Sequence, residues 1–155
     1  MSHTLDFESI VTNPDALKRA LIRMGIEESC IKISETPIRM HTYHEEECKF
    51  AHVVVRRRID DFCRGKSSDA GWEHNEEGVY IGHIDEFNYR VGDTFNSTWQ
   101  QKLYTYYNVE ATKIAFEKEG MEYTETTLKD GRIQLRAKFK TAPVSENKIK
   151  VHTTR

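Results

Sequence analysis

The alternation of apolar and polar residues predicts a chain that mixes helices and strands. In the segment NPDALKRALIRMG the apolar residues lie three and four positions apart, which is the spacing of one helix face. Asn13 suits the N-cap, Pro14 the first helical position, and Gly25 the left-handed residue that follows a last turn. We therefore predict a helix over residues 14–24.

Short β-prone runs lie on both sides of this helix. They are LDFESIV before it and CIKIS, PIRMHTY, FAHVVVRRRI and VYIGHIDEFNYRV after it. Between the last two, residues 60–78 are polar and rich in glycine and serine, without a sustained period. This composition predicts a loop insertion at about residues 60–78.

A second, longer helix is predicted within FNSTWQQKLYTYYNVEATKIAFEKEG, residues 95–120, and Gly120 closes it. Its apolar stripe recurs at close to 3.6 residues and consists of Phe95, Trp99, Leu103, Tyr107, Ala111, Ile114 and Ala115. We expect this stripe to face the core along the whole helix.

The last ordered element is predicted to be a β-hairpin. The alternating segments MEYTETTL and RIQLRAKF are joined at Asp130-Gly131, a dipeptide that strongly favours a two-residue turn. The residues after 140 are polar and predict a flexible tail over 141–155. We expect residues 1–140 to form a single domain.

The fold class that follows is α+β, with a largely antiparallel sheet and two helices packed on one face. The helix ends ALKRALIRMGIE and ATKIAFEKEGME are identical at five of twelve positions. Two interpretations stay open: amphipathic helices that end in glycine resemble one another by chance, or a strand-helix-strand-strand unit is duplicated.

Composition narrows the class of protein. With 37% hydrophobic and 31% charged residues the chain is expected to be globular, and its net charge of −2 gives no overall attraction to nucleic acid or anionic membrane. No apolar run approaches the ~20 residues of a membrane span. The start MSHTLDFESI lacks the features of a signal peptide, so we expect a cytoplasmic protein without a membrane partner.

The stretch HTYHEEECKFAH, residues 41–52, concentrates side chains of the metal-ligating type. In a helix, one face would carry His41, His44, Cys48 and His52, which could bind zinc and support a metal-dependent hydrolase. The β-prone flanks instead favour a hairpin with His44 and Cys48 in its loop. We therefore expect a polar hairpin and no metal or other cofactor.

Basic residues gather in two segments. At the end of FAHVVVRRR, alternation sends Arg56 and Arg58 to one face and Arg57 to the other. On the last predicted strand one face carries Arg132, Gln134, Arg136, Lys138 and Lys140. A turn at Asp130-Gly131 would place Glu125 opposite Arg136 and Tyr123 opposite Lys138, so the face is either solvated or binds single-stranded nucleic acid.

Three aromatic residues are candidates for contact with a partner. Tyr104 and Tyr106 lie off the apolar stripe of the long helix, and Trp72 falls in the predicted loop. Aromatic side chains of this kind commonly anchor protein interfaces. For catalysis, the chain has no phosphate loop, nucleophile elbow or dinucleotide fingerprint.

The start MSH, the helix ALKRALIRMG, the run YYNVEATKIAFEKEG and the closing TETTLKDGRIQL together resemble an uncharacterised hypothetical open-reading-frame family of algal plastids, cyanobacteria and phages. The resemblance covers approximately residues 1–26 and 100–137. It implies a compact α+β fold and a location in the cytoplasm of a bacterium or a phage-infected host. It implies no activity and no catalytic residues.

The leading hypothesis is a small non-enzymatic protein that binds another protein, with a homodimer left open. The alternative is a nucleic-acid-binding module that uses the basic residues, and the third is the metal-dependent hydrolase.

Overall fold

The structure is a computed structural model that describes residues 10–42, 48–56, 68–84 and 95–140. Contacts divide the chain into two compact units, residues 1–110 and 111–155, and each is described by itself. The first contains α1 (Pro14–Arg23), the short 3₁₀ helix η1 (Glu28–Cys30), β1 (Ile31–Arg39), β2 (Phe50–Val55), β3 (Ala70–His74), β4 (Tyr80–His83) and most of α2 (Ser97–Lys118). The second contains the end of α2, β5 (Met121–Thr127) and β6 (Ile133–Phe139).

The helix α1 forms where its capping residues predict. The side-chain oxygen of Asn13 accepts hydrogen bonds from the backbone N–H groups of Asp15 and Ala16, at 2.9 and 3.2 Å. Gly25, with φ of 94°, adopts the left-handed conformation that follows the helix. The apolar face, which consists of Ala16, Leu17, Ala20 and Leu21, is fully buried.

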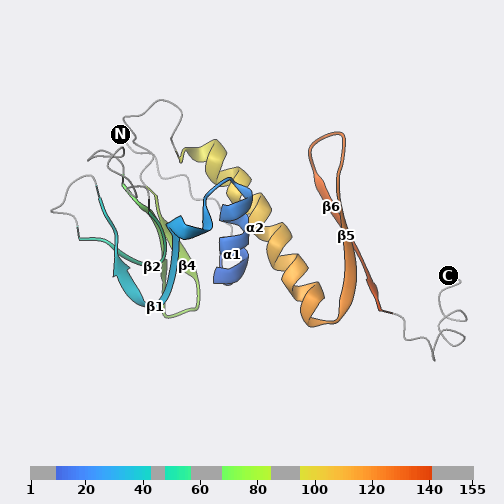
Figure 1. Ribbon diagram of the computed structural model, residues 1–155, viewed down its shortest axis with the longest axis horizontal. Coiled ribbons are helices and arrows are strands. Elements are labelled where there is room, and N and C mark those ends of the chain that lie inside the picture. The colour runs from blue at the N-terminus through green and yellow to red at the C-terminus, as the bar shows by residue number, and fades with distance from the viewer. Residues whose placement is uncertain (1–9, 43–47, 57–67, 85–94, 141–155) are drawn as a thin grey trace, which may run out of the picture. The chain divides into compact units, whose positions relative to one another are not determined.

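The first unit is built on an antiparallel sheet in the order β1-β2-β3-β4, and Figure 1 shows α1 and the first part of α2 on one side of it. The sheet residues Val53, Val55 and Trp72 are fully buried. CIKIS and PIRMHTY were predicted as separate runs, but they join in one strand, β1, whose pairing with β2 shifts register between Ile33 and Ile38.

The predicted loop over residues 60–78 is wrong in its second half, because residues 70–74 form β3. The strand is five residues long and ends in Glu73 and His74, which are exposed, so it carries only a short apolar signal. Residues 57–67 lie outside the described residues.

Two hydroxyl groups connect α2 to the rest of the first unit. Tyr107 accepts hydrogen bonds from the backbone N–H groups of Thr12 and Asn13, at 2.9 and 3.1 Å. Tyr104 accepts a 3.3 Å hydrogen bond from the indole N–H of Trp72. The two tyrosines therefore hold α2 against the start of α1 and against the sheet.

The apolar stripe predicted along α2 is correct only for its first part. Leu103 and Tyr107 are buried, but Ala115 is exposed, and Val109 and Glu110 are buried outside the predicted stripe. The first compact unit ends at Glu110. A single stripe assumes one packing surface along the whole helix, whereas the two ends of α2 belong to different units.

The α+β class is confirmed, but the strands form two sheets, because β5 and β6 pair only with each other among the described residues. The order β4, α2, β5, β6 repeats the strand-helix-strand-strand pattern. Ahead of α1, the only β structure among the described residues is the isolated bridge between Val11 and Tyr80. The duplication therefore stays a prediction.

The second face of the four-stranded sheet carries a small cluster of buried residues, Met40, Ala51 and Val54, with Ile38 packed against it. Gly71 lies beneath this cluster. A Cβ atom added to Gly71 would lie 2.5 Å from the Met40 sulfur and 2.8 Å from the Ala51 methyl carbon. Only glycine is compatible with this close approach.

We predict that Gly71→Ala lowers the free energy of unfolding by about 1–3 kcal/mol, the usual cost of overpacking a core. Urea unfolding monitored by tryptophan fluorescence would measure it. Because the Ala51 methyl group is a fixed obstacle, the double variant Gly71→Ala/Ala51→Gly should recover part of the loss. A single variant as stable as the parent would contradict this account of the packing.

Candidate functional site

An ion pair between a fully buried aspartate and a partly buried arginine joins the ends of three strands in the first unit. The side chain of Asp69 is fully buried, and its Oδ2 atom lies 2.7 Å from Nη1 of Arg56. The same oxygen accepts the backbone N–H of His41 at 2.9 Å, and Arg56 also donates to the Arg39 carbonyl at 3.0 Å. Asp69 therefore connects the residues after β1, after β2 and before β3.

The neighbouring His41 does not form a general-base pair with Asp69. His41 Nδ1 lies 3.8 Å from Oδ2 of Asp69, beyond hydrogen-bond distance, and half of the His41 side chain is exposed. Arg56 already holds this carboxylate oxygen. The arrangement fits a structural ion pair, which the sequence did not reveal because Asp69 lies in the predicted loop.

We predict that Arg56→Met lowers the free energy of unfolding by about 3 kcal/mol, because it leaves a buried carboxylate without its cation. The matched control is Arg132→Met. Arg132 also contacts a carboxylate, Asp130, at 2.6 Å, but both side chains are more than half exposed. The control should cost less than about 1 kcal/mol in the same urea titration. Equal effects would show that burial does not govern the Asp69 pair.

The predicted metal ligands that the structure describes, His41, Cys48 and His52, do not form a metal site. His44 lies outside the described residues, and within the described parts of the chain no three His, Cys, Asp or Glu side chains could hold a metal ion. His52 Nδ1 accepts the backbone N–H of His74 at 2.9 Å, which occupies one ring nitrogen. Cys48 is exposed. The predicted pairing of the segments on either side of this stretch is confirmed, since β1 and β2 are antiparallel neighbours.

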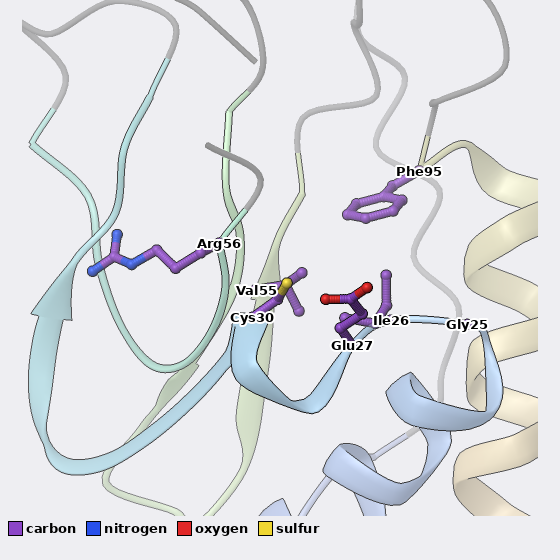
Figure 2. Close-up of a pocket in the computed structure, with 7 residues that line it drawn as sticks. All are labelled: Gly25, Ile26, Glu27, Cys30, Val55, Arg56 and Phe95. Atoms are coloured by element: carbon purple, nitrogen blue, oxygen red, sulfur yellow. The ribbon is translucent and has the colours of Figure 1, made fainter. Parts of the chain in front are cut away.

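A small open cleft lies between the end of α1 and the sheet (Figure 2). Its volume is about 240 Å³, and its lining consists of Gly25, Ile26, Glu27, Cys30, Val55, Arg56 and Phe95. Figure 2 shows the Arg56 side chain pointing away from it. Ligand pockets are usually ~300–1,000 Å³ with several convergent polar groups. This cleft lacks both features.

The three predicted partner-binding aromatics lie in different surroundings. The expectation of a loop-borne Trp72 is wrong, since this side chain is fully buried in β3. Tyr104 contacts Trp72 within the fold. Tyr106 is half-buried, and the guanidinium of Arg23 lies 4.4 Å from its ring centroid. A partner contact at Tyr106 stays a prediction.

Burial raises the pKa of the Tyr104 hydroxyl above its ordinary value of 10.0, and the hydrogen bond from Trp72 opposes this effect. The unfolded chain therefore loses this proton at lower pH than the folded chain. The resulting stability is present below pH 10 and is lost as pH rises from 10 through the folded pKa. Burial also raises the pKa of Tyr80, which acts in the same direction.

We predict that Tyr104→Phe flattens the loss of stability above pH 10. At neutral pH the variant should be about 1–3 kcal/mol less stable, because the buried indole N–H of Trp72 loses its acceptor. Thermal unfolding between pH 7 and pH 11 would measure both effects. Tyr106→Phe serves as the control. An unchanged alkaline slope in Tyr104→Phe would contradict the role given to this hydroxyl.

The second unit contains a two-stranded β-hairpin, and neither of its outer edges pairs with another strand among the described residues. β5 and β6 pair over their full lengths, from Met121↔Phe139 to Thr127↔Ile133. One face of this hairpin contacts the end of α2. Tyr123 donates to Glu117 at 2.8 Å, and Lys113 lies 2.7 Å from Glu125.

The hairpin exists as predicted, but its register differs by one residue. Gly131, with φ of 85°, adopts the left-handed conformation, and its N–H donates to the Leu128 carbonyl at 2.9 Å. The loop therefore has three residues, 129–131, instead of two. A shift of one residue moves every side chain on one strand to the other face relative to its partner.

This register overturns the predicted basic and aromatic face. Tyr123 lies opposite Ala137, and Glu125 lies opposite Leu135, so both are on the face that contacts α2. The other face pairs Glu122 with Lys138 and Thr124 with Arg136. Within the described hairpin, the basic stripe therefore has no tyrosine beside it.

The remaining basic residues of the nucleic-acid prediction either contact a carboxylate or lie outside the described residues. Arg132 contacts the Asp130 carboxylate, and Arg56 is held by Asp69. Arg57 and Arg58 lie outside the described residues.

The pairing also determines which backbone groups point outward. The N–H of Leu128 donates to the Arg132 carbonyl at 2.8 Å, so these residues form a hydrogen-bonded pair. Such pairs alternate along an antiparallel ladder with pairs whose N–H and C=O groups point away from the partner strand. The outward groups on β6 therefore belong to Ile133, Leu135, Ala137 and Phe139.

Comparison of the chain with protein families, curated proteins and solved structures finds no match. Membership in the plastid, cyanobacterial and phage family therefore stays a prediction. In the part of the chain that the structure describes, no helix is both long and apolar enough to cross a membrane.

Proposed function

We propose that this chain is a non-enzymatic protein-binding module whose working surface is the β5–β6 hairpin. The observation that supports the proposal is the pairing of the hairpin. Neither outer edge of β5 or β6 pairs with another strand among the described residues. Each edge therefore offers a ladder of backbone donors and acceptors to an extended segment of a partner.

The energetics of a hairpin favour this use. An isolated two-stranded hairpin is only marginally stable in water. Here the end of α2 supports one face through Tyr123 and Glu125. The opposite face is largely exposed along its length, as Thr124, Thr126 and Arg136 illustrate. A bound strand would extend the sheet and supply the backbone hydrogen bonds that the hairpin alone leaves to water.

The edges of the four-stranded sheet are less suited to strand addition. β1 contains Pro37, which has no N–H group, and its pairing is irregular between Ile33 and Ile38. At the other edge, the N–H of Tyr80 in β4 donates to the Val11 carbonyl at 2.7 Å. Proteins commonly protect sheet edges by these means.

The proposal is tested by affinity capture from the cells of origin, followed by mass spectrometry. The double variant Thr127→Pro/Ala137→Pro removes one outward N–H group from each edge without removing a hydrogen bond within the hairpin. We predict that the affinity of this variant for the captured proteins falls at least about tenfold, which corresponds to ~1.4 kcal/mol of binding free energy.

The matched control is Lys129→Pro. This residue occupies a turn position that favours proline, so the edges stay intact and capture should be unchanged. Circular dichroism would verify that both variants fold. Equal capture by the double variant and the parent would overturn the proposal. So would capture of nucleic acid alone, recognised by its removal with nuclease and its steep loss with salt.

A further inference from the structure

The two edges of the hairpin differ in charge on the exposed face. On that face β6 carries Gln134, Arg136 and Lys138, whereas β5 carries Glu122, Thr124 and Thr126. Arg136 lies opposite the neutral Thr124, and Glu122 is the one acidic residue of this face. Among the described residues no ion pair engages Arg136 or Lys138. The β6 edge is therefore locally basic.

We propose that the β6 edge binds an extended segment of a partner protein in which acidic residues alternate with apolar residues. This inference rests on the proposed function and adds the edge, the binding mode and the chemistry of the partner. The alternation follows from the two faces of β6. Arg136 and Lys138 point to one face, and Leu135, Ala137 and Phe139 point to the other.

The hydrogen-bond geometry determines where the apolar and the acidic residues of the partner strand would lie. Outward N–H and C=O groups belong to Leu135 and Ala137, so an added strand would form hydrogen-bonded pairs with these residues. Its side chains at these positions lie beside apolar neighbours. At the end of the row Phe139, 68% exposed, offers further apolar surface.

The residues of the added strand opposite Arg136 and Lys138 would occupy non-hydrogen-bonded pairs. In an antiparallel ladder the Cα atoms of such pairs are about 4.5 Å apart, closer than in hydrogen-bonded pairs. Side chains at these positions interact directly, and opposite charges stabilise the pairing while like charges destabilise it. Acidic residues are therefore favoured at both positions.

The same rule disfavours a second copy of the chain as the occupant. Antiparallel pairing of two β6 strands centred on Arg136 would place the two copies of this arginine opposite each other. Pairing centred on Leu135 would place Lys138 opposite Arg132 of the other copy, which again brings like charges together. Pairing of β6 with the β5 strand of another copy would be head-to-tail and would not close into a dimer.

The inference is tested with two blocked synthetic peptides that bind without any cellular partner. One alternates glutamate with valine over seven residues, and the other alternates lysine with valine. We expect fluorescence anisotropy at low salt to show about tenfold tighter binding of the glutamate peptide, because the charge pairs change sign. The variant Arg136→Glu/Lys138→Glu should reverse this preference.

A matched pair of proline variants identifies the edge. Ala137→Pro removes an outward N–H group of β6 and should weaken binding of the glutamate peptide by at least about tenfold, whereas Thr127→Pro on β5 should leave it unchanged. Hydrogen exchange gives an independent readout. The amides of Leu135 and Ala137 should gain protection when the glutamate peptide binds.

Several results would overturn the inference. They are equal binding of the two peptides, loss of binding in Thr127→Pro instead of Ala137→Pro, and absence of binding by either peptide. If the hairpin still captures proteins from cells in any of these cases, the proposed function stands and only the β6 assignment fails. Self-association that Ala137→Pro abolishes would assign the edge to a second copy and would also overturn the inference.

Discussion

A β-strand leaves half of its backbone donors and acceptors unpaired wherever no neighbour covers its edge, and this constraint shapes both sheets of the protein. In the four-stranded sheet the outer strands are interrupted or paired, by Pro37 in β1 and by Val11 beside β4. The β5–β6 hairpin has neither device in the described residues. The difference between the two sheets, more than any single side chain, supports the proposal that the hairpin is the working surface.

The aromatic and basic side chains that stand out in the sequence of the first unit make contacts that stabilise its fold. Trp72 is buried beneath Tyr104, and Tyr107 caps the backbone ahead of α1. Arg56, which the sequence offers as a candidate for nucleic-acid binding, neutralises the buried Asp69. Aromatic and basic residues in a sequence indicate function only when folding leaves them accessible, and these contacts largely remove that accessibility.

The sequence predicted features that depend on neighbouring residues. Asn13 and Gly25 correctly marked the two ends of α1, because capping is a local interaction. Asp130-Gly131 likewise marked the hairpin. Features that depend on distant residues were missed. Asp69 carries no signal for its pairing with Arg56, and β3 is too short for a recognisable period. The register of the hairpin depended on a turn with three residues instead of two, which moved Tyr123 away from the basic residues.

The left-handed Gly131 sets both the faces and the edges of the hairpin, because the three-residue loop keeps Leu128 opposite Arg132. If the same residues closed as a two-residue turn at Asp130-Gly131, Lys129 would lie opposite Arg132 and the ladder would shift by one position. The side chains of β6 would then exchange faces relative to β5, and the backbone groups of β5 that point outward would change as well. A chain of unchanged length can therefore form two different hairpins, and the conformation of its loop determines which surface a partner meets.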